Sequence, residues 1–346
     1  MLAPEPGGAH VVRPRSKRIR PGVRIPPLVR YVVRRVAWSA LLIALVSFFT
    51  FLVFYVLPSA DPALLRVGRQ ATPDQVAAVR ASLGLDQPFY DQFWIYAKHV
   101  VTGFDLGYSY YAEVPVRQEI VSRLPASISV ALGAFILWMA IAVPVGILTA
   151  LRPRSRSDRA VTGATLFFMS APTYWLGLVV LFLFARDIGA FPVVGGAGTY
   201  VPFSESPSGW LESLVLPWIV LAAGFAGLYA RMIGENLRQA MAQDFVRTAR
   251  AKGLGEQRIV LRHGLRAALA PIVTLAALDL GFLLGGTILV ETVFNIPGVG
   301  RYAVEAIQNG DLPAIQGTVL FGAIFIVLAI LVSDVLYAVL DPRVRY

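Results

Sequence analysis

The sequence contains no cysteine, only three histidines and few charged residues, and each shortage excludes a class of function. Without cysteine there can be no disulfide framework, no thiolate metal site and no cysteine nucleophile. His10, His99 and His263 are far apart in the sequence, so we expect no histidine metal cluster and no catalytic triad. Charged residues make up 15% of the chain and hydrophobic residues 56%, unlike an average soluble domain. We therefore expect a membrane protein with no metal site and no cofactor.

The common nucleotide-binding and hydrolase motifs are missing as well. The sequence has no G-x-x-x-x-G-K-[ST] phosphate loop and no G-x-S-x-G nucleophile elbow. The run Gly298-Val-Gly300-Arg-Tyr-Ala303 fits a dinucleotide fingerprint in form only, because it follows a predicted membrane span and not a strand. We expect a chain that is not an enzyme and does not bind ATP by itself. An intramembrane enzyme is therefore disfavoured.

Long apolar runs predict six membrane-spanning helices, since about 20 residues of helix cross a bilayer. The first run follows Arg34-Arg35 and resembles a signal peptide in its basic flank, but it is too long and lacks a small-residue cleavage site. The expected fold is an all-α integral membrane protein. The six spans are predicted near 33–57, 126–151, 161–184, 212–233, 267–292 and 317–340.

Basic residues gather in three segments, and their distribution predicts the orientation of the chain. The segments are the tail before the first span, the loop after the second span and the loop after the fourth. By the positive-inside rule, both termini and these two loops face the cytoplasm. The net charge of +10 is thus a topology signal and does not indicate nucleic-acid binding. The residues are Arg13, Arg15, Lys17, Arg18, Arg20, Arg24, Arg30, Arg34 and Arg35; Arg152, Arg154, Arg156 and Arg159; and Arg238, Arg247, Arg250, Lys252, Arg258, Arg262 and Arg266.

Two segments lie outside the predicted spans and are long enough to need their own interpretation. Residues 1–30 are rich in proline, glycine and arginine, which predicts a disordered cytoplasmic tail that either contacts anionic lipid or is only an extension. Residues 58–125 form an extracytoplasmic segment with two amphipathic helices, the first after a Thr72–Gln75 capping box and the second after Pro88. This segment either roofs the pore or caps the bundle without touching substrate.

Apart from Glu212 at the first position of the fourth span, three acidic residues fall within predicted spans, where ionisable groups are costly and usually face protein or water. Glu291 lies near the outer end of its span and Asp334 near the inner end of the last one, whereas Asp279 lies deeper. Asp279 and Glu291 are candidate pore-lining residues. Asp279 has two open interpretations: contact with a cationic or amine-bearing substrate, or a hydrogen bond between helices.

The loop between the fourth and fifth spans carries the most informative pattern. A short basic helix from Asp244 ends after Arg250-Ala-Lys252, where Gly253 suits a left-handed helix end, and a second amphipathic helix is predicted over 256–266. The segment has too few apolar residues to fold alone. We expect it to lie at the membrane surface and dock onto another protein.

This loop closely resembles the coupling loop, or EAA loop, of ABC importer permeases, in particular the dipeptide/oligopeptide/nickel family. The resemblance extends from about residue 30 to the end of the chain. Arg247 replaces the usual first glutamate of the EAA triplet, and His263-Gly-Leu265-Arg266 replaces the usual I-x-L-P, as in the B-type half of peptide permease pairs. Further similar motifs are Glu291-Thr-Val-Phe-Asn-Ile-Pro-Gly-Val-Gly-Arg301, Asp311-Leu-Pro313, Gln316-Gly317 and the terminal run from Tyr337 to Tyr346.

The resemblance implies a type I ABC importer permease fold, with a first transmembrane helix over 31–57 and a five-helix core over 126–346 whose coupling loop is 235–266. It also implies two sets of functional residues. The ATPase-coupling set is Arg247, Thr248, Ala249, Ala251, Lys252, Gly253, His263, Leu265 and Pro271. The external loop facing a binding protein contains Phe294, Pro297, Gly298, Gly300 and Arg301.

By this resemblance, the chain forms half of a pore in a bacterial inner membrane. Its expected partners are a second homologous permease in a heterodimer, two cytoplasmic ATPases, an extracytoplasmic substrate-binding protein and the lipid bilayer, with no nucleic acid. Short peptides are the expected substrate, and nickel chelate, haem or glutathione are alternatives. A stand-alone secondary transporter is the rival from another class, and the few paired charges in the spans disfavour it.

Overall fold

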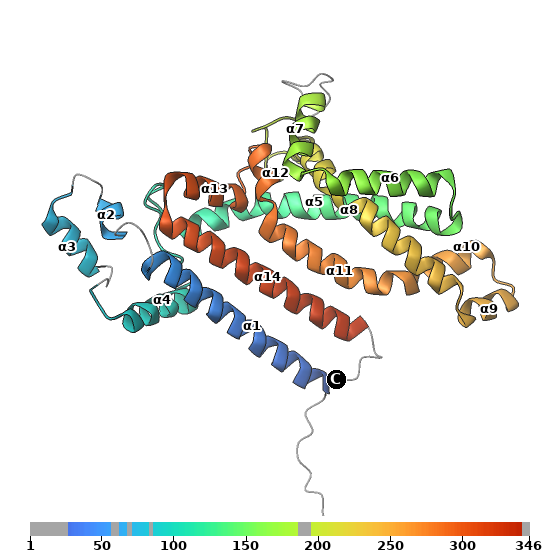
Figure 1. The fold of residues 1–346 in the computed structure, drawn as a ribbon, viewed down its shortest axis with the longest axis horizontal. Coiled ribbons are helices and arrows are strands. Elements are labelled where there is room, and N and C mark those ends of the chain that lie inside the picture. Colours follow the sequence, from blue (N-terminus) through green and yellow to red (C-terminus); the bar gives the residue numbers. More distant parts are fainter. Residues whose placement is uncertain (1–26, 57–61, 68–70, 83–85, 186–194, 341–346) are drawn as a thin grey trace, which may run out of the picture.

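The computed structural model describes residues 27–56, 62–67, 71–82, 86–185 and 195–340. The regular structure of these ranges is helical (Figure 1), apart from an isolated bridge between Tyr108 and Pro115. Most of the tail expected to be disordered and the last part of the matched terminal run fall at 1–26 and 341–346, outside the described residues. Helix α1 begins at Pro27, inside the predicted tail.

Within the described ranges, five helices are long and apolar enough to cross a membrane. The fifth predicted span, 267–292, comprises most of α11 and the short α12 (Ile288–Val293). All five helices lie where the sequence predicted a span, so the all-α membrane fold is confirmed. The spans lie within α1 (Pro27–Phe51, continued by η1, Leu52–Val56), α5 (Val116–Leu151), α8 (Pro207–Met241), α11 (Leu265–Gly286) and α14 (Leu312–Leu340). Helix α11 directly continues α10 (Glu256–Arg258) and the π-helical η2 (Ile259–Gly264), which precede the predicted span.

The third predicted span, 161–184, is not one straight helix. It consists of α6 (Arg156–Ser170) and α7 (Thr173–Phe184), which meet at an angle of 106°. Pro172 explains the break, because its ring disfavours helical geometry at the residue before it and removes a backbone donor. Ala171 is accordingly extended, with φ −81° and ψ 128°. The prediction of six spans therefore holds only if this bent pair counts as one.

Two other predicted boundaries shift because the helices continue past the bilayer-length runs. Helix α5 begins at Val116, so 116–125 belongs to a spanning helix and not to the extracytoplasmic segment. Helix α8 continues to Met241, beyond the predicted limit at 233. Hydropathy marks the apolar part of a helix, whereas the polar ends are fixed by capping and packing.

Helices α5 and α8 pack along one another and form the centre of the bundle. Trp138 of α5 is fully buried and stacks on Phe225 of α8 with ring centroids 4.6 Å apart. Helix α14 packs between α11 and α1 (Figure 1). Arg35 of α1 and Asp334 of α14 form an ion pair at 3.0 Å, which gives the third predicted intramembrane acid a partner.

The bundle has two different ends (Figure 1). We call the end with the α5–α6 connection (152–155) and the segment 242–258, including α9 (Asp244–Ala251), the basic end. The start of α1 and the end of α14 lie there too, so the segments predicted to share one side do lie together. That this side is cytoplasmic remains a prediction. The opposite end, the capped end, carries α2 (Pro62–Val67), α3 (Pro73–Ser82), α4 (Phe89–Gly103) and α13 (Val299–Asn309).

The helices of the predicted extracytoplasmic segment form as expected. The capping box is confirmed, with the Thr72 N–H donating to Gln75 Oε1 at 3.0 Å and the Gln75 N–H donating to Thr72 Oγ1 at 3.4 Å. Phe93 of α4 packs edge-on against Phe48 and Phe51 of α1. This contact supports the interpretation as a packing cap, and a contact with substrate remains a prediction.

Candidate functional site

The segment between α8 and α11 folds around a small apolar cluster. Val246 and Ile259 are fully buried and Ala249 nearly so, and Met241 and Leu254 pack against them. The cluster joins α9 to the end of α8 and to η2, so this segment is held by the bundle and could not fold alone. We call residues 242–264 the coupling segment.

Gly253 ends α9 in the predicted left-handed conformation, with φ +74°. Its N–H donates to the Arg250 carbonyl at 2.9 Å, and the Leu254 N–H donates to the Ala249 carbonyl at 3.3 Å, which together form a Schellman motif. A Cβ at this position would meet no atom within 4 Å. Backbone geometry alone therefore requires glycine here.

The charges of the coupling segment are at its surface. The Arg250 guanidinium donates to Glu256 at 3.1 Å across the Gly253 turn, and this hydrogen bond lowers the pKa of the Glu256 carboxyl. Arg247 reaches only the exposed Asp244, at 3.6 Å, and its side chain is 79% exposed. Lys252 is exposed as well. The segment thus presents cations to whatever lies beyond it.

A cavity of about 350 Å³ opens between α9 and the continuous helix formed by η2 and α11. It is lined by one aromatic residue, three basic residues and an alanine. Of these lining residues, only His263 belonged to the predicted coupling set. The sequence signal for Arg262 and Arg266 was their spacing of four residues, which places both on one face of a helix. The lining residues are Phe245, Arg262, His263, Arg266 and Ala267.

The structure divides the predicted coupling set. Ala249 faces the internal cluster, whereas Thr248 and Ala251 are exposed on α9 beside Arg247. Leu265 is half-buried against the main core, and Pro271 lies further along α11, on an exposed face of the helix. A partner protein could therefore contact only some residues of the predicted coupling set, such as Arg247, Thr248 and Ala251.

The external loop between α12 and α13 is pinned by its apolar residues. Phe294 and Ile296 are almost completely buried, and Phe294 lies beside Gly177 of α7. Asn295 and Pro297 are exposed at the tip, and Asn295 has a positive φ of 53°. Of the residues predicted to face a binding protein, Pro297 lies at the surface, Gly300 and Arg301 are partly exposed, and Phe294 and Gly298 are inside.

Glu291 is completely buried beneath this loop. Its Oε1 accepts hydrogen bonds from the hydroxyls of Ser127 at 2.7 Å and Thr287 at 2.5 Å, and its Oε2 accepts from the Arg301 N–H at 2.9 Å. A Cβ at Gly298 would lie 2.3 Å from the carboxylate, so the loop can pass here only as glycine. The structure thus places this candidate pore-lining residue inside the chain, with no exposed surface in this conformation.

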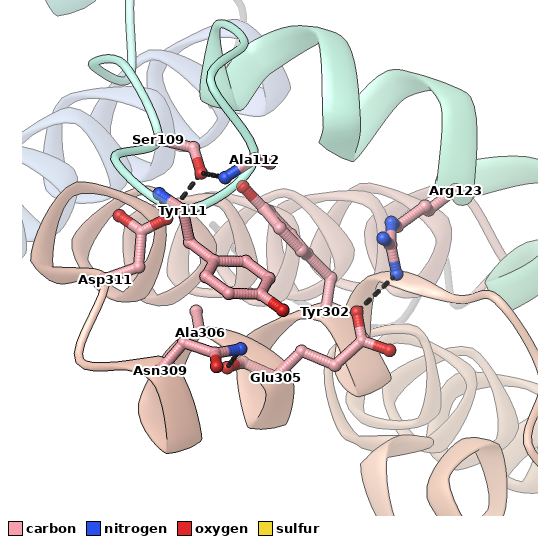
Figure 2. Close-up of a pocket in the computed structure, with 9 residues that line it drawn as sticks. All are labelled: Ser109, Tyr111, Ala112, Arg123, Tyr302, Glu305, Ala306, Asn309 and Asp311. Atoms are coloured by element: carbon pink, nitrogen blue, oxygen red, sulfur yellow. Dashed lines mark hydrogen bonds and ion pairs between the residues drawn. The ribbon is translucent and has the colours of Figure 1, made fainter.

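A second buried carboxylate, Asp311, lies at the start of α14 (Figure 2). It accepts hydrogen bonds from the Ser109 hydroxyl, from the N–H groups of Tyr110 and Tyr111 at 3.3 Å, and from the Ala314 N–H at 3.4 Å. It therefore caps α14 and holds the turn at 109–112 against it. The sequence showed this residue only as part of a matched motif, without a role.

Asp311 borders a cavity of about 340 Å³, whose other side is an ion-pair network (Figure 2). Arg123 donates to Glu119 at 2.9 Å and to Glu305 at 3.0 Å, and its guanidinium lies 4.8 Å from the ring centre of Tyr302. Burial raises the pKa of the Tyr302 phenol to about 12. The network ties α5 to α13, beside the external loop.

Asp279, the deepest of the three acids, lies on α11 and accepts a hydrogen bond from the hydroxyl of Tyr229 on α8 at 2.5 Å. Tyr229 is buried, whereas Asp279 is partly exposed. The helix–helix hydrogen bond, one of the two interpretations left open by the sequence, is therefore present. Exposure of Asp279 to a pore remains a prediction.

The structure is a multi-span helical bundle with a protruding amphipathic segment at one end and a buried loop at the other, as expected of a membrane permease. The family model for the inner membrane component of binding-protein-dependent transport systems matches residues 142–346, and the model for the N-terminal part of such membrane components matches 28–131. The chain belongs to this family. It is a multi-pass inner-membrane permease subunit of an ABC importer, a class that works with an ATPase and a substrate-binding protein.

Individual relatives cover nearly the whole chain. It is 40% identical to a putative peptide transport system permease protein of Brucella abortus (strain 2308) over 318 residues, 91% of this chain and 98% of the relative. It is 37% identical to the glutathione transport system permease protein GsiC of Salmonella typhi over 319 residues, 92% of this chain and all of the relative. The resemblance drawn from the coupling loop is confirmed.

Proposed function

We propose that this chain forms half of a translocation pore for short peptides. A second, homologous permease completes the pore, two cytoplasmic ATPases drive it, and an extracytoplasmic binding protein delivers the substrate. The coupling segment carries the proposal, because it is a braced, cation-bearing projection that a membrane protein working alone would not need. Relatives described as peptide permeases support the substrate.

The ATPase docks, in this proposal, on the exposed face of α9 and on the cavity lined by Phe245, Arg262, His263 and Arg266. Phe245 offers an apolar contact, and the surrounding cations favour a partner surface with acidic side chains. Charge complementarity of this kind mainly sets orientation and association rate. The apolar cluster beneath α9 keeps the segment folded whether or not the partner is bound.

Movement of the docked segment reaches the membrane through one continuous helix. Residues 256–286 run without a break from α10 through η2 into α11, and η2 is a π-helical stretch of the kind often found at functional sites. Closure of the ATPases on ATP would therefore tilt or shift the fifth span directly. We propose that this motion alternates the access of the pore.

Glutathione, itself a short peptide, is the second candidate substrate, and the relatives described as glutathione permeases favour it. Both candidates carry an ammonium group. Asp279 is the acidic side chain placed to meet such a group if its partly exposed side lines the pore.

Reconstitution of the complete transporter tests the proposal. Proteoliposomes with both permeases and the ATPases, supplied with the binding protein outside and ATP inside, should accumulate labelled di- or tripeptides. The purified chain alone should neither hydrolyse ATP nor transport. Competition by glutathione distinguishes the two substrates. Uptake by this chain alone, driven by an ion gradient, would refute the proposal and support a secondary transporter.

A further inference from the structure

We propose that Glu291 is a positioning residue that fixes the external loop to α5 and so sets the surface offered to the binding protein. The inference rests on the proposed function, in which residues 294–301 face that protein. A carboxylate buried without hydrogen bonds is unfavourable, so the three donors that meet Glu291 from different elements indicate that this position is built to hold it.

The carboxylate joins three parts of the chain. Thr287 holds it from its own helical turn, the Arg301 N–H belongs to the first turn of α13, and Ser127 comes from α5. Ser127 makes a second link, because its hydroxyl also accepts the Val299 N–H at 2.9 Å. Two N–H groups of the first turn of α13, those of Val299 and Arg301, have no partner within the helix and are satisfied by Ser127 and Glu291.

The backbone packs closely around the Glu291 carboxylate. Gly298 and Gly300 bring the backbone so close that a Cβ would lie 2.3 Å from the Glu291 carboxylate at the first and 2.9 Å from its Oε2 at the second. The side chain is completely buried, so it contacts neither solvent nor substrate in this conformation. Its hydrogen bonds hold α13 in place.

The hydrogen bond to Ser127 connects the external loop to a helix that reaches the other end of the bundle. Helix α5 begins at the capped end, packs along α8 and ends at Leu151 at the basic end, where α8 leads into the coupling segment. The external loop is therefore tied to the same pair of helices that carries the ATPase-facing segment. Loss of the hydrogen bonds to Ser127 should let the external loop and α13 move, so that the docking surface is less well defined, although every residue that would touch the binding protein is still present.

Ser127→Ala is the sharpest variant, because it removes the hydrogen bonds that join α5 to Glu291 and to the Val299 N–H, while the Arg123–Glu305 ion pair between α5 and α13 is left in place. Ser213→Ala is the matched control. Ser213 is also a buried serine of a spanning helix, but its hydroxyl bonds residues outside α12 and α13: it donates to the Trp210 carbonyl of its own helix at 2.9 Å and accepts the Val201 N–H at 3.5 Å. Glu291→Gln is a second variant, in which an amide nitrogen replaces one of the two accepting oxygens.

The first readout needs no partner protein. Because the chain lacks cysteine, a nitroxide can be attached at Ile307→Cys, an exposed position of α13. Ser127→Ala and Glu291→Gln should make this label more mobile in the resting transporter, and Ser213→Ala should leave its spectrum unchanged. Equal spectra for all variants would overturn the proposal.

The second readout separates positioning from simple loss of structure. In the reconstituted transporter, ATP hydrolysis is measured against the concentration of the importer's own binding protein. Ser127→Ala should raise the half-saturating concentration roughly three- to tenfold, the loss expected for one hydrogen bond, while the rate at saturation changes little. A fall in the saturated rate and in membrane abundance, with an unchanged half-saturating concentration, would overturn the proposal. If the wild type itself does not respond to the binding protein, the proposed function fails, and the spectra still decide whether Glu291 holds α13.

Discussion

Two carboxylates at each end of this permease make opposite kinds of contact. At the basic end, Glu256 and Asp244 are exposed and pair with the arginines of the coupling segment. At the capped end, Glu291 and Asp311 are buried and accept hydrogen bonds from hydroxyls and backbone N–H groups. The first kind of contact is screened by water and weak, whereas the second is held in a low dielectric and costly to break.

The difference teaches how one chain can serve two kinds of partner. Exposed ion pairs exchange easily, which suits the surface that we propose for a moving ATPase. Buried carboxylates with several hydrogen bonds hold a single geometry, which suits the surface that we propose for a binding protein. The comparison depends on the assignment of the two ends to opposite sides of the membrane.

The largest expected effect is an all-or-none difference in labelling. Ser155 and Ser206 cap α6 and α8 at opposite ends of the bundle, each accepting a backbone N–H. In the cysteine-free chain, a cysteine at Ser206 should react with an impermeant thiol reagent on whole cells, and a cysteine at Ser155 only after lysis. The reverse pattern would show that the orientation read from the arginines is wrong.

The next effect concerns stability and compares one glutamate from each end. Glu291→Ala should reduce the free energy of unfolding by on the order of 3 kcal/mol, since it leaves a cavity and a buried N–H without a partner. Glu256→Ala, at an exposed pair, should change it little. Thermal unfolding in detergent and abundance in the membrane measure both. If Glu291→Ala and Glu256→Ala lost equal stability, the contrast between buried and exposed carboxylates would be wrong.

A smaller change in energy should still have a clear effect on transport at the basic end. Gly253→Val forces a β-branched residue to a φ of +74°, at a cost on the order of 1 kcal/mol or more. We expect normal insertion but weaker ATPase co-purification and transport, because α10 is displaced. Gly255→Val is the control, since Gly255 has equally open surroundings but an ordinary φ of −64°. Normal transport by Gly253→Val would refute a coupling role for the turn.

The smallest expected effect is a pH dependence of opposite sign at the two ends. Tyr302 has a raised pKa, so its contribution to stability is complete below pH 10 and is lost as the pH rises towards about 12. Glu256 has a lowered pKa, so its small contribution is present at neutral pH and is lost as acid protonates it.

Nitroxides at Ile307→Cys on α13 and at Ala251→Cys on α9 can follow this behaviour. The first label should gain mobility in alkali and the second in acid. Tyr302→Phe should abolish the alkaline change, and Glu256→Gln the acidic one. A change that persists in these variants would show that other groups cause it.

Much of the fold could be read from the sequence, because the bilayer imposes strong local rules. Each span needs a long apolar run, so the apolar composition of 126–151 and 317–340 was enough to predict a helix in each. The left-handed turn at Gly253 and the capping box at Thr72 are local as well, since each depends on a few consecutive residues. The bend at Pro172 was also a local signal, but a hydropathy window averages over it.

The sequence by itself determined the class of protein, the approximate spans and the amphipathic segment between α8 and α11, because these follow from composition and short-range pattern. Only the tertiary structure decided what the acidic residues do. Glu291 and Asp279 were both candidate pore-lining residues, yet one is enclosed by Ser127, Thr287 and the turn of α13, whereas the other meets Tyr229 and stays partly exposed. Ser127 lies 164 residues from Glu291 in the chain. The environment of a buried charge is set by such distant neighbours, and no local pattern records them.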